Sequence, residues 1–199
     1  GKVQDFGRYI VKQAILCGAA WQKEGIRVPI AVNLSPYNLL DPGLITFIEQ
    51  TLFQAKLSAH FIHIELTENE TSLNIKYIKE ALEKIRRLGI KIAIDDFGTG
   101  MSSLAYLDTL KADTIKIDRT FIFDLETNKG HRAIVSAAVN IAKSFECNVV
   151  AEGVETKQHA DLLVSMGCYT AQGYYYAKPM PEKDIKHLLA NGILPDALA

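Results

Sequence analysis

The chain has 199 residues, of which 48% are hydrophobic and 23% charged, so it can bury one sizeable core and is neither disordered nor fibrous in type. Its 22 Lys and Arg residues nearly balance 23 Asp and Glu residues, for a formal net charge of −1. This balance excludes the basic surface that coats nucleic acid and argues against DNA as a partner. No apolar stretch approaches the roughly 18 residues of a membrane span, so we expect no direct membrane insertion.

The three cysteines indicate the compartment. Cys17, Cys147 and Cys168 show no CxxC spacing and lie in apolar runs, which is typical of buried free thiols in a reducing compartment rather than of a disulfide framework. The N-terminus also lacks the apolar core of a signal peptide. We therefore expect a cytoplasmic location. The chain can equally be the cytoplasmic domain of a longer protein that is anchored in a membrane.

Short β-branched runs alternate along the chain with longer segments of helical periodicity, as in repeated βα units around a parallel sheet. An amphipathic helix is predicted first, from Val3 to Lys23. The six predicted strands are Ile30 to Leu34, Phe61 to Leu66, Lys91 to Asp95, Thr114 to Ile117, Asn148 to Ala151 and Tyr169 to Tyr174. The other predicted helices are one opened by Asp41 and Pro42 as N-cap and N1, one closed by Gly89, Ser102 to Leu110, Arg132 to Phe145, one closed by Gly167, and Glu182 to Asn191.

The spacing of the strand ends predicts a barrel. They recur at intervals from 20 residues, between Glu152 and Gln172, to 34 residues, between Asp118 and Glu152, close to the roughly 30 per unit of a (β/α)₈ barrel. Six strands are two fewer than that barrel needs. Because the chain opens directly with a helix, we expect the missing strands to precede residue 1. We predict that residues 1–199 form a single α/β barrel domain that is N-terminally incomplete.

Polar residues stand where the predicted apolar strands stop: Asn33, Glu65, Asp95 with Asp96, Lys116 with Asp118, and Glu152. An acid in an apolar strand is costly unless it is paired or binds a metal. A lone acid of this kind is more often a helix cap or a solvated charge, but recurrence over several strands favours a site. The carboxyl ends of barrel strands converge on the face where active sites are built, so we expect a single cluster.

The types of these residues predict the metal. Carboxylate and amide oxygens suit Mg²⁺ or Mn²⁺ rather than structural zinc. Carboxylates this crowded repel each other unless cations and the nearby Lys116 compensate their charge. Two ions are the natural number, because one carboxylate of the adjacent pair Asp95 and Asp96 can bridge ions about 3.5 to 4 Å apart while its neighbour reaches only the second, as in phosphodiester cleavage by a metal-activated water. Lys116 would then hold that water or a phosphate oxygen.

Other residues carry weaker signals. Asn33 can begin a plain Asx turn, Glu68 can be a helix N-terminal charge, and Gly98-Thr-Gly100 more often forms a tight turn than a phosphate loop. Tyr174-Tyr175-Tyr176 is predicted at the barrel wall and rim, with stacking of one ring on a base as the alternative. The histidines lack ligand spacing and are predicted to be surface or core residues: His60, His63, His131, His159 and His187.

Six segments form an ordered set along the chain: Asn33-Leu-Ser, Glu65-Leu-Thr-Glu68, Asp95-Asp-Phe-Gly-Thr-Gly-Met-Ser-Ser-Leu104, Lys116-Ile-Asp118, Ala151-Glu-Gly-Val-Glu155 and Gln172-Gly-Tyr-Tyr-Tyr-Ala-Lys-Pro179. In order and spacing the set resembles the EAL family of bacterial cyclic di-GMP phosphodiesterases, over nearly the whole chain. The resemblance implies a TIM-like (β/α)₈ barrel with one antiparallel strand, which linearises cyclic di-GMP to pGpG with Mg²⁺ or Mn²⁺.

The resemblance also implies roles for single residues. It assigns Asn33, Glu65 and Asp95 to a first metal ion and Asp95, Asp96 and Glu152 to a second. Lys116 would orient the hydrolytic water, with Asp118 and Gln172 beside it.

Further residues would support the site by the same resemblance. Glu68 would tether the loop from Phe97 to Ser103, which contains Gly98 and Thr99, and Glu155 would brace the site from behind the ligands. In this family that loop supports dimerisation and couples it to the metals. We therefore expect a homodimer, with a sensor or GGDEF-type domain possible in the same parent protein.

One departure from the family pattern leaves alternatives open. The segment Glu-Ala-Leu-Leu-Arg-Trp that names the family is absent, and we expect it before Gly1, where it would supply a first-metal ligand and an arginine for a substrate phosphate. We therefore expect these residues alone to hydrolyse very little cyclic di-GMP. The alternative is a catalytically inactive cyclic di-GMP receptor or dimerisation module. A barrel enzyme acting on a carbonyl substrate is less favoured, since Lys116 alone qualifies as a strand-end base.

Overall fold

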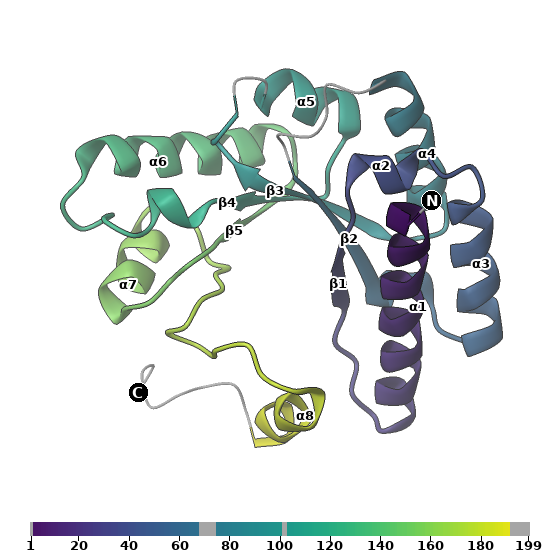
Figure 1. The fold of residues 1–199 in the computed structure, drawn as a ribbon. Helices are drawn as coiled ribbons and strands as arrows, with labels where there is room; N and C mark the ends of the chain where they lie inside the picture. Colours follow the sequence, from purple (N-terminus) through teal and green to yellow (C-terminus); the bar gives the residue numbers. More distant parts are fainter. Residues whose placement is uncertain (1, 68–74, 101–102, 192–199) are drawn as a thin grey trace. The chain divides into compact units, whose positions relative to one another are not determined.

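The structure is a computed structural model that describes residues 2–67, 75–100 and 103–191 (Figure 1). Helices and strands alternate along these residues. The strands are β1 (Ile30–Asn33), β2 (Ile62–Thr67), β3 (Lys91–Phe97), β4 (Thr114–Ile117) and β5 (Asn148–Ala151). The helices are α1 (Lys2–Lys23), α2 (Pro36–Leu39), α3 (Leu44–Ala55), α4 (Ile75–Arg87), α5 (Ser103–Leu110), α6 (Lys129–Ser144), α7 (Lys157–Ser165) and α8 (Glu182–Asn191), with short 3-10 turns η1 (Ala59–Phe61) and η3 (Arg119–Phe121).

The described residues fall into two compact units. The first unit is drawn from the ranges Gly1–Asp95 and Thr99–Asp113, and the second unit from the ranges Asp96–Gly98 and Thr114–Ala199. The first division between them falls inside β3, at the peptide bond that joins Asp95 to Asp96. Each unit has its own parallel strands and its own apolar core.

Three parallel strands form the sheet of the first unit. Ile30 of β1 is opposite Ile62 of β2, and His63 of β2 is opposite Lys91 of β3. The isoleucines and leucine of β2 are fully buried, whereas the alternate residues of this strand are half-buried. α1 packs against β1 and along α3 (Figure 1), with Val11 and Ile15 fully buried. Hydrophobic burial of one sheet face against helices thus leaves the other face for polar side chains.

An ion pair ties α1 to the turn before α3. Arg8 donates from Nε and Nη2 to the two carboxylate oxygens of Asp41, at 2.6 and 2.8 Å, and Asp41 also accepts from the Gly43 N–H at 3.0 Å. The hydrogen bonds from Arg8 lower the pKa of Asp41, although burial acts in the opposite direction. The prediction that Asp41 and Pro42 open the helix is wrong by two residues: α3 begins at Leu44, because the Asp41 carboxylate is directed to Arg8.

In the second unit, β4 and β5 pair in parallel, with Thr114 opposite Asn148, and α6 packs against both strands. The predicted sixth strand from Tyr169 to Tyr174 is wrong, since this segment makes one isolated parallel bridge, between Ala151 and Ala171. β5 ends at Ala151, and the segment from Tyr169 to Tyr174 itself leads into a turn, in which the Tyr176 N–H donates to the Gly173 carbonyl at 3.0 Å. The segment therefore has too little partner strand to extend the pairing.

Most sequence-predicted helices are confirmed with small shifts of their ends. Gly89 and Gly167 follow α4 and α7 with φ of 98° and 85°, the left-handed conformation that a helix-ending glycine adopts at little cost. None of the three cysteines forms a disulfide, and Cys168 is buried whereas the other two are half-buried. Among the described helices, none has both the length and the apolar character needed to cross a membrane.

Asp41 makes the stability of the first unit depend on pH. Its pKa is lower in the folded chain than in the unfolded chain, so its contribution is complete above the unfolded pKa of about 4 and is lost as pH falls through the folded pKa. We expect Asp41→Asn to lower the free energy of unfolding near pH 7 by about 1–2 kcal/mol. Urea unfolding of both proteins from neutral pH to about pH 2.5 measures the difference, which should shrink as the pH falls below about 4.

The exposed Asp108 on α5 provides the matched control. Asp108→Asn should change the unfolding free energy little at any of these pH values. A loss in Asp41→Asn that stays constant down to low pH would contradict the role given to its carboxylate.

Candidate functional site

The carboxyl ends of the strands in the first unit present three oxygen-bearing side chains. Asn33 is directly opposite Glu65, and Glu65 is opposite Ala93, two residues before Asp95. Paired residues of parallel strands project from the same face, as do residues two apart along one strand. The register therefore places the side chains of Asn33, Glu65 and Asp95 on one face of the first unit.

Asp96, the next residue along β3, belongs to the second unit and has an unusual backbone. Its φ is 54°, in the left-handed region that aspartate enters more readily than most residues. Such strained conformations cluster at functional sites. A carboxylate oxygen of Asp96 lies within 4.8 Å of one of Glu152, and its carboxyl group forms a hydrogen bond with Asp118.

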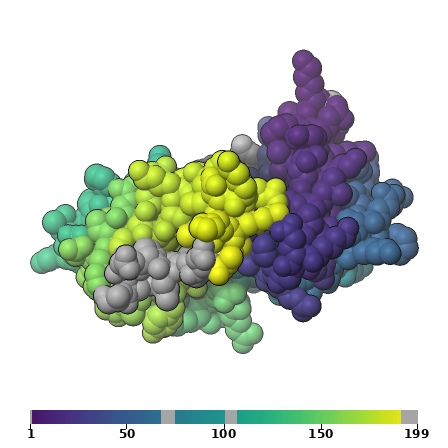
Figure 2. Space-filling model, turned by 90° about the horizontal axis from the view of Figure 1, so that it is seen from below, coloured from purple at the N-terminus to yellow at the C-terminus, as the bar shows by residue number. Residues whose placement is uncertain are grey.

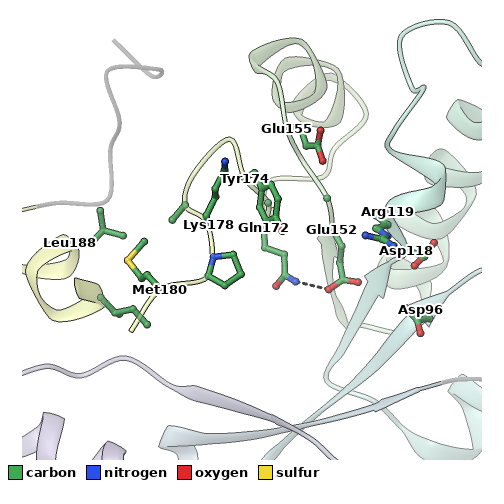
Figure 3. Close-up of a pocket in the computed structure, with 15 residues that line it drawn as sticks. Asp96, Asp118, Arg119, Glu152, Glu155, Gln172, Tyr174, Lys178, Met180 and Leu188 are labelled. Carbon is green, nitrogen blue, oxygen red and sulfur yellow. Dashed lines mark hydrogen bonds between the residues drawn. The ribbon is translucent and has the colours of Figure 1, made fainter. Parts of the chain in front are cut away.

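Glu152, directly after β5, is held by two side chains that reach the same oxygen. Lys116 Nζ lies 2.7 Å from Glu152 Oε1, and Gln172 Nε2 donates to that oxygen at 2.6 Å (Figure 3). The Glu152 N–H donates to the Ile117 carbonyl at 3.0 Å. Lys116 is only 5% exposed, and a buried ammonium needs a partner of this kind. Both the backbone and the carboxylate of Glu152 are therefore fixed in place.

Asp118 is one acid of this group whose charged form is favoured. Burial acts to raise its pKa, but hydrogen bonds from the Thr120 side chain and N–H and from the Asp96 carboxyl group, with the charge of Arg119, hold the pKa below its ordinary value. Two carboxyl groups within hydrogen-bond reach must share a proton or have a cation between them. The arrangement of Asp96, Asp118 and Glu152 thus favours binding of a cation.

A pocket of about 840 Å³ opens beside these acids in the second unit (Figure 3). Its polar wall consists of Asp96, Asp118, Arg119, Glu152 and Gln172, and its apolar wall includes Pro179, Met180, Ile185 and Leu188. Tyr174 and Glu155 also line the pocket, and Lys178 Nζ lies 5.7 Å from the centre of the Tyr174 ring. The volume is within the usual range for small-molecule sites. A flat apolar group would suit the apolar wall, and the acidic wall would accept an anionic group only with a cation between them.

Arg119 and the apolar wall of the pocket were not predicted from the sequence. Ile185 and Leu188 are three residues apart on α8, so helical spacing alone places them on one face. α8 lies at the surface of the molecule (Figure 2, yellow), and the sequence does not reveal which cavity that face borders. The spacing of Ile185 and Leu188 therefore predicts a shared helix face, but it does not predict that this face lines the pocket.

The remaining predicted residues are placed as follows. Gly98 has a φ of 98°, and a Cβ there would lie 3.0 Å from the Phe121 ring, so the tight turn is supported by a close contact. Thr99 belongs to the first unit. Glu68 lies outside the described residues, as do residues 101 and 102 of the predicted loop. The roles given to these residues stay predictions.

A Glu-Ala-Leu tripeptide does occur in the chain, at Glu80, Ala81 and Leu82. It lies inside α4, with Glu80 exposed and the next two residues buried. A motif that binds metal at a barrel's active face would stand at a strand end. The tripeptide in α4 is therefore a helical core segment and does not replace the absent one.

Parallel strands that alternate with helices and carry oxygen-bearing side chains at their carboxyl ends are typical of α/β barrel proteins. The family model described as "EAL domain" matches residues 1–179. The chain belongs to the EAL family. Its structural neighbours in this family are TIM-like barrels, so the predicted fold class is confirmed.

Three similar proteins illustrate the relationship. Cyclic di-GMP phosphodiesterase NbdA of Pseudomonas aeruginosa is 39% identical over 163 residues, which are 82% of this chain and 21% of NbdA. The crystal structure of the EAL domain of Mycobacterium smegmatis DcpA is 34% identical, with a TM-score of 0.91 over 97% of this chain and 87% of that one. The manganese and cyclic di-GMP complex of Klebsiella pneumoniae BlrP1 is 30% identical, with a TM-score of 0.81 over 88% of this chain and 45% of that one.

The curated relatives are much longer than this chain. The chain spans 31% of the Mycobacterium tuberculosis relative and 24% of the Bacillus subtilis signaling protein YkoW.

The close approach of Gly173 to a neighbouring loop positions Gln172, and it can be tested by substitution. A Cβ on Gly173 would lie 2.1 Å from the Val154 carbonyl oxygen and 2.3 Å from its nitrogen, so Gly173→Ala must displace the segment that carries Gln172. We expect a loss of about 3 kcal/mol or more in the free energy of unfolding, measured by urea denaturation.

Gly25→Ala is the matched control, because Gly25 also has a positive φ, of 83°, but nothing lies within 4 Å of the position of its Cβ. It should lose only about 1–2 kcal/mol, from backbone strain alone. Equal losses in the two variants would show that the contact with Val154 is unimportant.

Proposed function

We propose that this chain supplies catalytic machinery of a cyclic di-GMP phosphodiesterase that opens the cyclic dinucleotide to linear pGpG with Mg²⁺ or Mn²⁺. The observation that carries the proposal is the fixed position of Glu152, held by Lys116 and Gln172 at the polar end of the pocket. Membership of the EAL family, which includes the phosphodiesterase NbdA, supports it.

The donor set fits a hard divalent cation. Carboxylate and amide oxygens are the ligands that Mg²⁺ and Mn²⁺ prefer, and the related BlrP1 was solved with manganese and cyclic di-GMP. In this proposal Asn33, Glu65 and Asp95 hold one ion, and Asp95, Asp96 and Glu152 hold a second. When bound, such ions supply Lewis acidity and lower the pKa of coordinated water.

The reaction adds water across one P–O3′ bond, and the chain's own residues position its parts. The water oxygen binds phosphorus, the P–O3′ bond breaks, and a proton from the water ends on the departing 3′ oxygen. Lys116 Nζ donates a hydrogen bond to the attacking water or to a phosphate oxygen, while Gln172 keeps the Glu152 carboxylate in one orientation. Arg119, with Asp118 at the same wall of the pocket, offers positive charge to a phosphate.

The apolar part of the pocket suits the base of the nucleotide. Met180, Ile185 and Leu188 provide apolar surface, and Tyr174 provides a ring on which a guanine can stack. Homodimerisation and a fused sensor or GGDEF-type domain stay predictions, as does a cytoplasmic location.

Hydrolysis by the full-length protein tests the proposal. With Mn²⁺ and cyclic di-GMP, chromatography should show pGpG, and a chelator should abolish its formation. Lys116→Ala should lower kcat by about 10² or more with little change in KM, because Lys116 acts on the reacting water rather than on ground-state binding.

Lys129→Ala, which changes an exposed lysine on α6, is the control and should keep normal kinetics. Near-normal kcat in Lys116→Ala would remove Lys116 from the mechanism. Binding of cyclic di-GMP without hydrolysis would indicate the receptor alternative instead.

A further inference from the structure

His159 is a buried polar residue in the first turn of α7. It is 6% exposed, and its N–H donates to the Thr156 hydroxyl at 3.0 Å, the bond that caps the helix. Its ring is thereby attached to a rigid helix start. A buried imidazole must find partners for its nitrogens within the protein.

The two ring nitrogens face two different loops. Nδ1 accepts from the backbone N–H of Glu155 at 3.5 Å, and Nε2 lies 3.8 Å from Oε1 of Glu126. An imidazole that accepts at Nδ1 carries its hydrogen at Nε2 when neutral, and that hydrogen is on the side of the carboxylate. The ring therefore connects the loop after β5 with the loop before α6.

The loop that carries Glu126 is itself anchored. Arg132 Nη1 donates to the carbonyl oxygens of Leu125 and Glu126, at 2.8 and 2.7 Å. Asn128 caps α6 by accepting from the N–H groups of the helix's first turn. His159 thus contacts a fixed point rather than a loose surface loop.

The loop after β5 is held on its other side as well. The Val154 N–H donates to the Gln172 carbonyl at 3.1 Å, and the Tyr175 N–H donates to the Val154 carbonyl at 3.0 Å. A Cβ on Gly153 would lie 2.5 Å from the Arg119 Cβ. Among these contacts of the loop, the backbone N–H of Glu155 is the group whose partner is His159.

We propose that His159 is a positioning residue: it fixes the backbone at Glu155, and with it the wall of the pocket that Glu155 lines. The consequence for catalysis rests on the proposed function, whereas the structural effect does not. Loss of the ring's acceptor should let the loop after Glu152 open locally, which weakens ligand binding more than it slows the chemical step.

Hydrogen exchange in the nucleotide-free, full-length protein tests the structural part. His159→Leu fills a similar space but removes both polar contacts, and it should make the Glu155 amide exchange about tenfold faster. His159→Gln retains an amide oxygen that can accept and an NH₂ that can face Glu126, so exchange should stay within about twofold of the wild type. His60→Leu, at an exposed histidine, is the control and should leave the Glu155 amide unchanged.

Kinetics with cyclic di-GMP test the functional part. His159→Leu should raise KM about tenfold with a smaller effect on kcat, and His159→Gln should restore it. Unchanged exchange and KM in His159→Leu would overturn the proposal, as would a folded His159→Gln that behaves like His159→Leu. If the wild type neither binds nor hydrolyses cyclic di-GMP, the proposed function fails, and the exchange result still decides the role of His159.

Discussion

The second unit depends on how a lysine ammonium is accommodated inside an apolar strand. Lys116 lies between the buried Ile115 and Ile117 of β4 and is almost fully buried itself. Desolvation of its charge is costly unless an anion is held against it, and Glu152 provides that anion at 2.7 Å. The parallel pairing of β4 with β5 brings the two residues together, because it places Ile117 opposite Ala151. Sheet register and charge pairing therefore support each other.

The position of Glu152 is also linked to close packing of the neighbouring backbone. Gln172 can reach Glu152 only if its segment lies close to the loop after β5, and a glycine at position 173 permits that approach. Asp96 enters the same unit through a left-handed turn of the backbone. Backbone strain and close contacts thus occur beside the Glu152 carboxylate, as expected where a site must be rigid before its ligand arrives.

Much of the fold could be predicted from the sequence because hydrophobic periodicity reports burial directly. The alternation of β2, with Ile62, Ile64 and Leu66 buried, and the helix-ending glycines Gly89 and Gly167 are local signals. The strand-end acids were identifiable for the same reason, since a charge within an apolar run is conspicuous. Their common face in the first unit follows from strand register.

The errors and omissions have a shared physical cause, which is dependence on distant residues. Asp41 has the chemistry of a helix cap, but Arg8, 33 residues earlier, determines its direction. The segment from Tyr169 to Tyr174 has the composition of a strand, but pairing requires a partner strand that ends too soon. The contacts of His159 lie in part on another loop, so no local pattern distinguishes it from an ordinary core histidine.

The central claim is that the acids at the strand ends form a metal site in which Glu152 is a ligand. Calorimetric titration of the nucleotide-free, full-length protein with Mn²⁺ tests it most directly, comparing the wild type with Glu152→Gln and with Glu49→Gln, which alters an exposed glutamate on α3. The account predicts saturable binding that Glu152→Gln weakens at least about tenfold and Glu49→Gln leaves unchanged. Absence of Mn²⁺ binding in the wild type, or equal affinity in the wild type and Glu152→Gln, would contradict it.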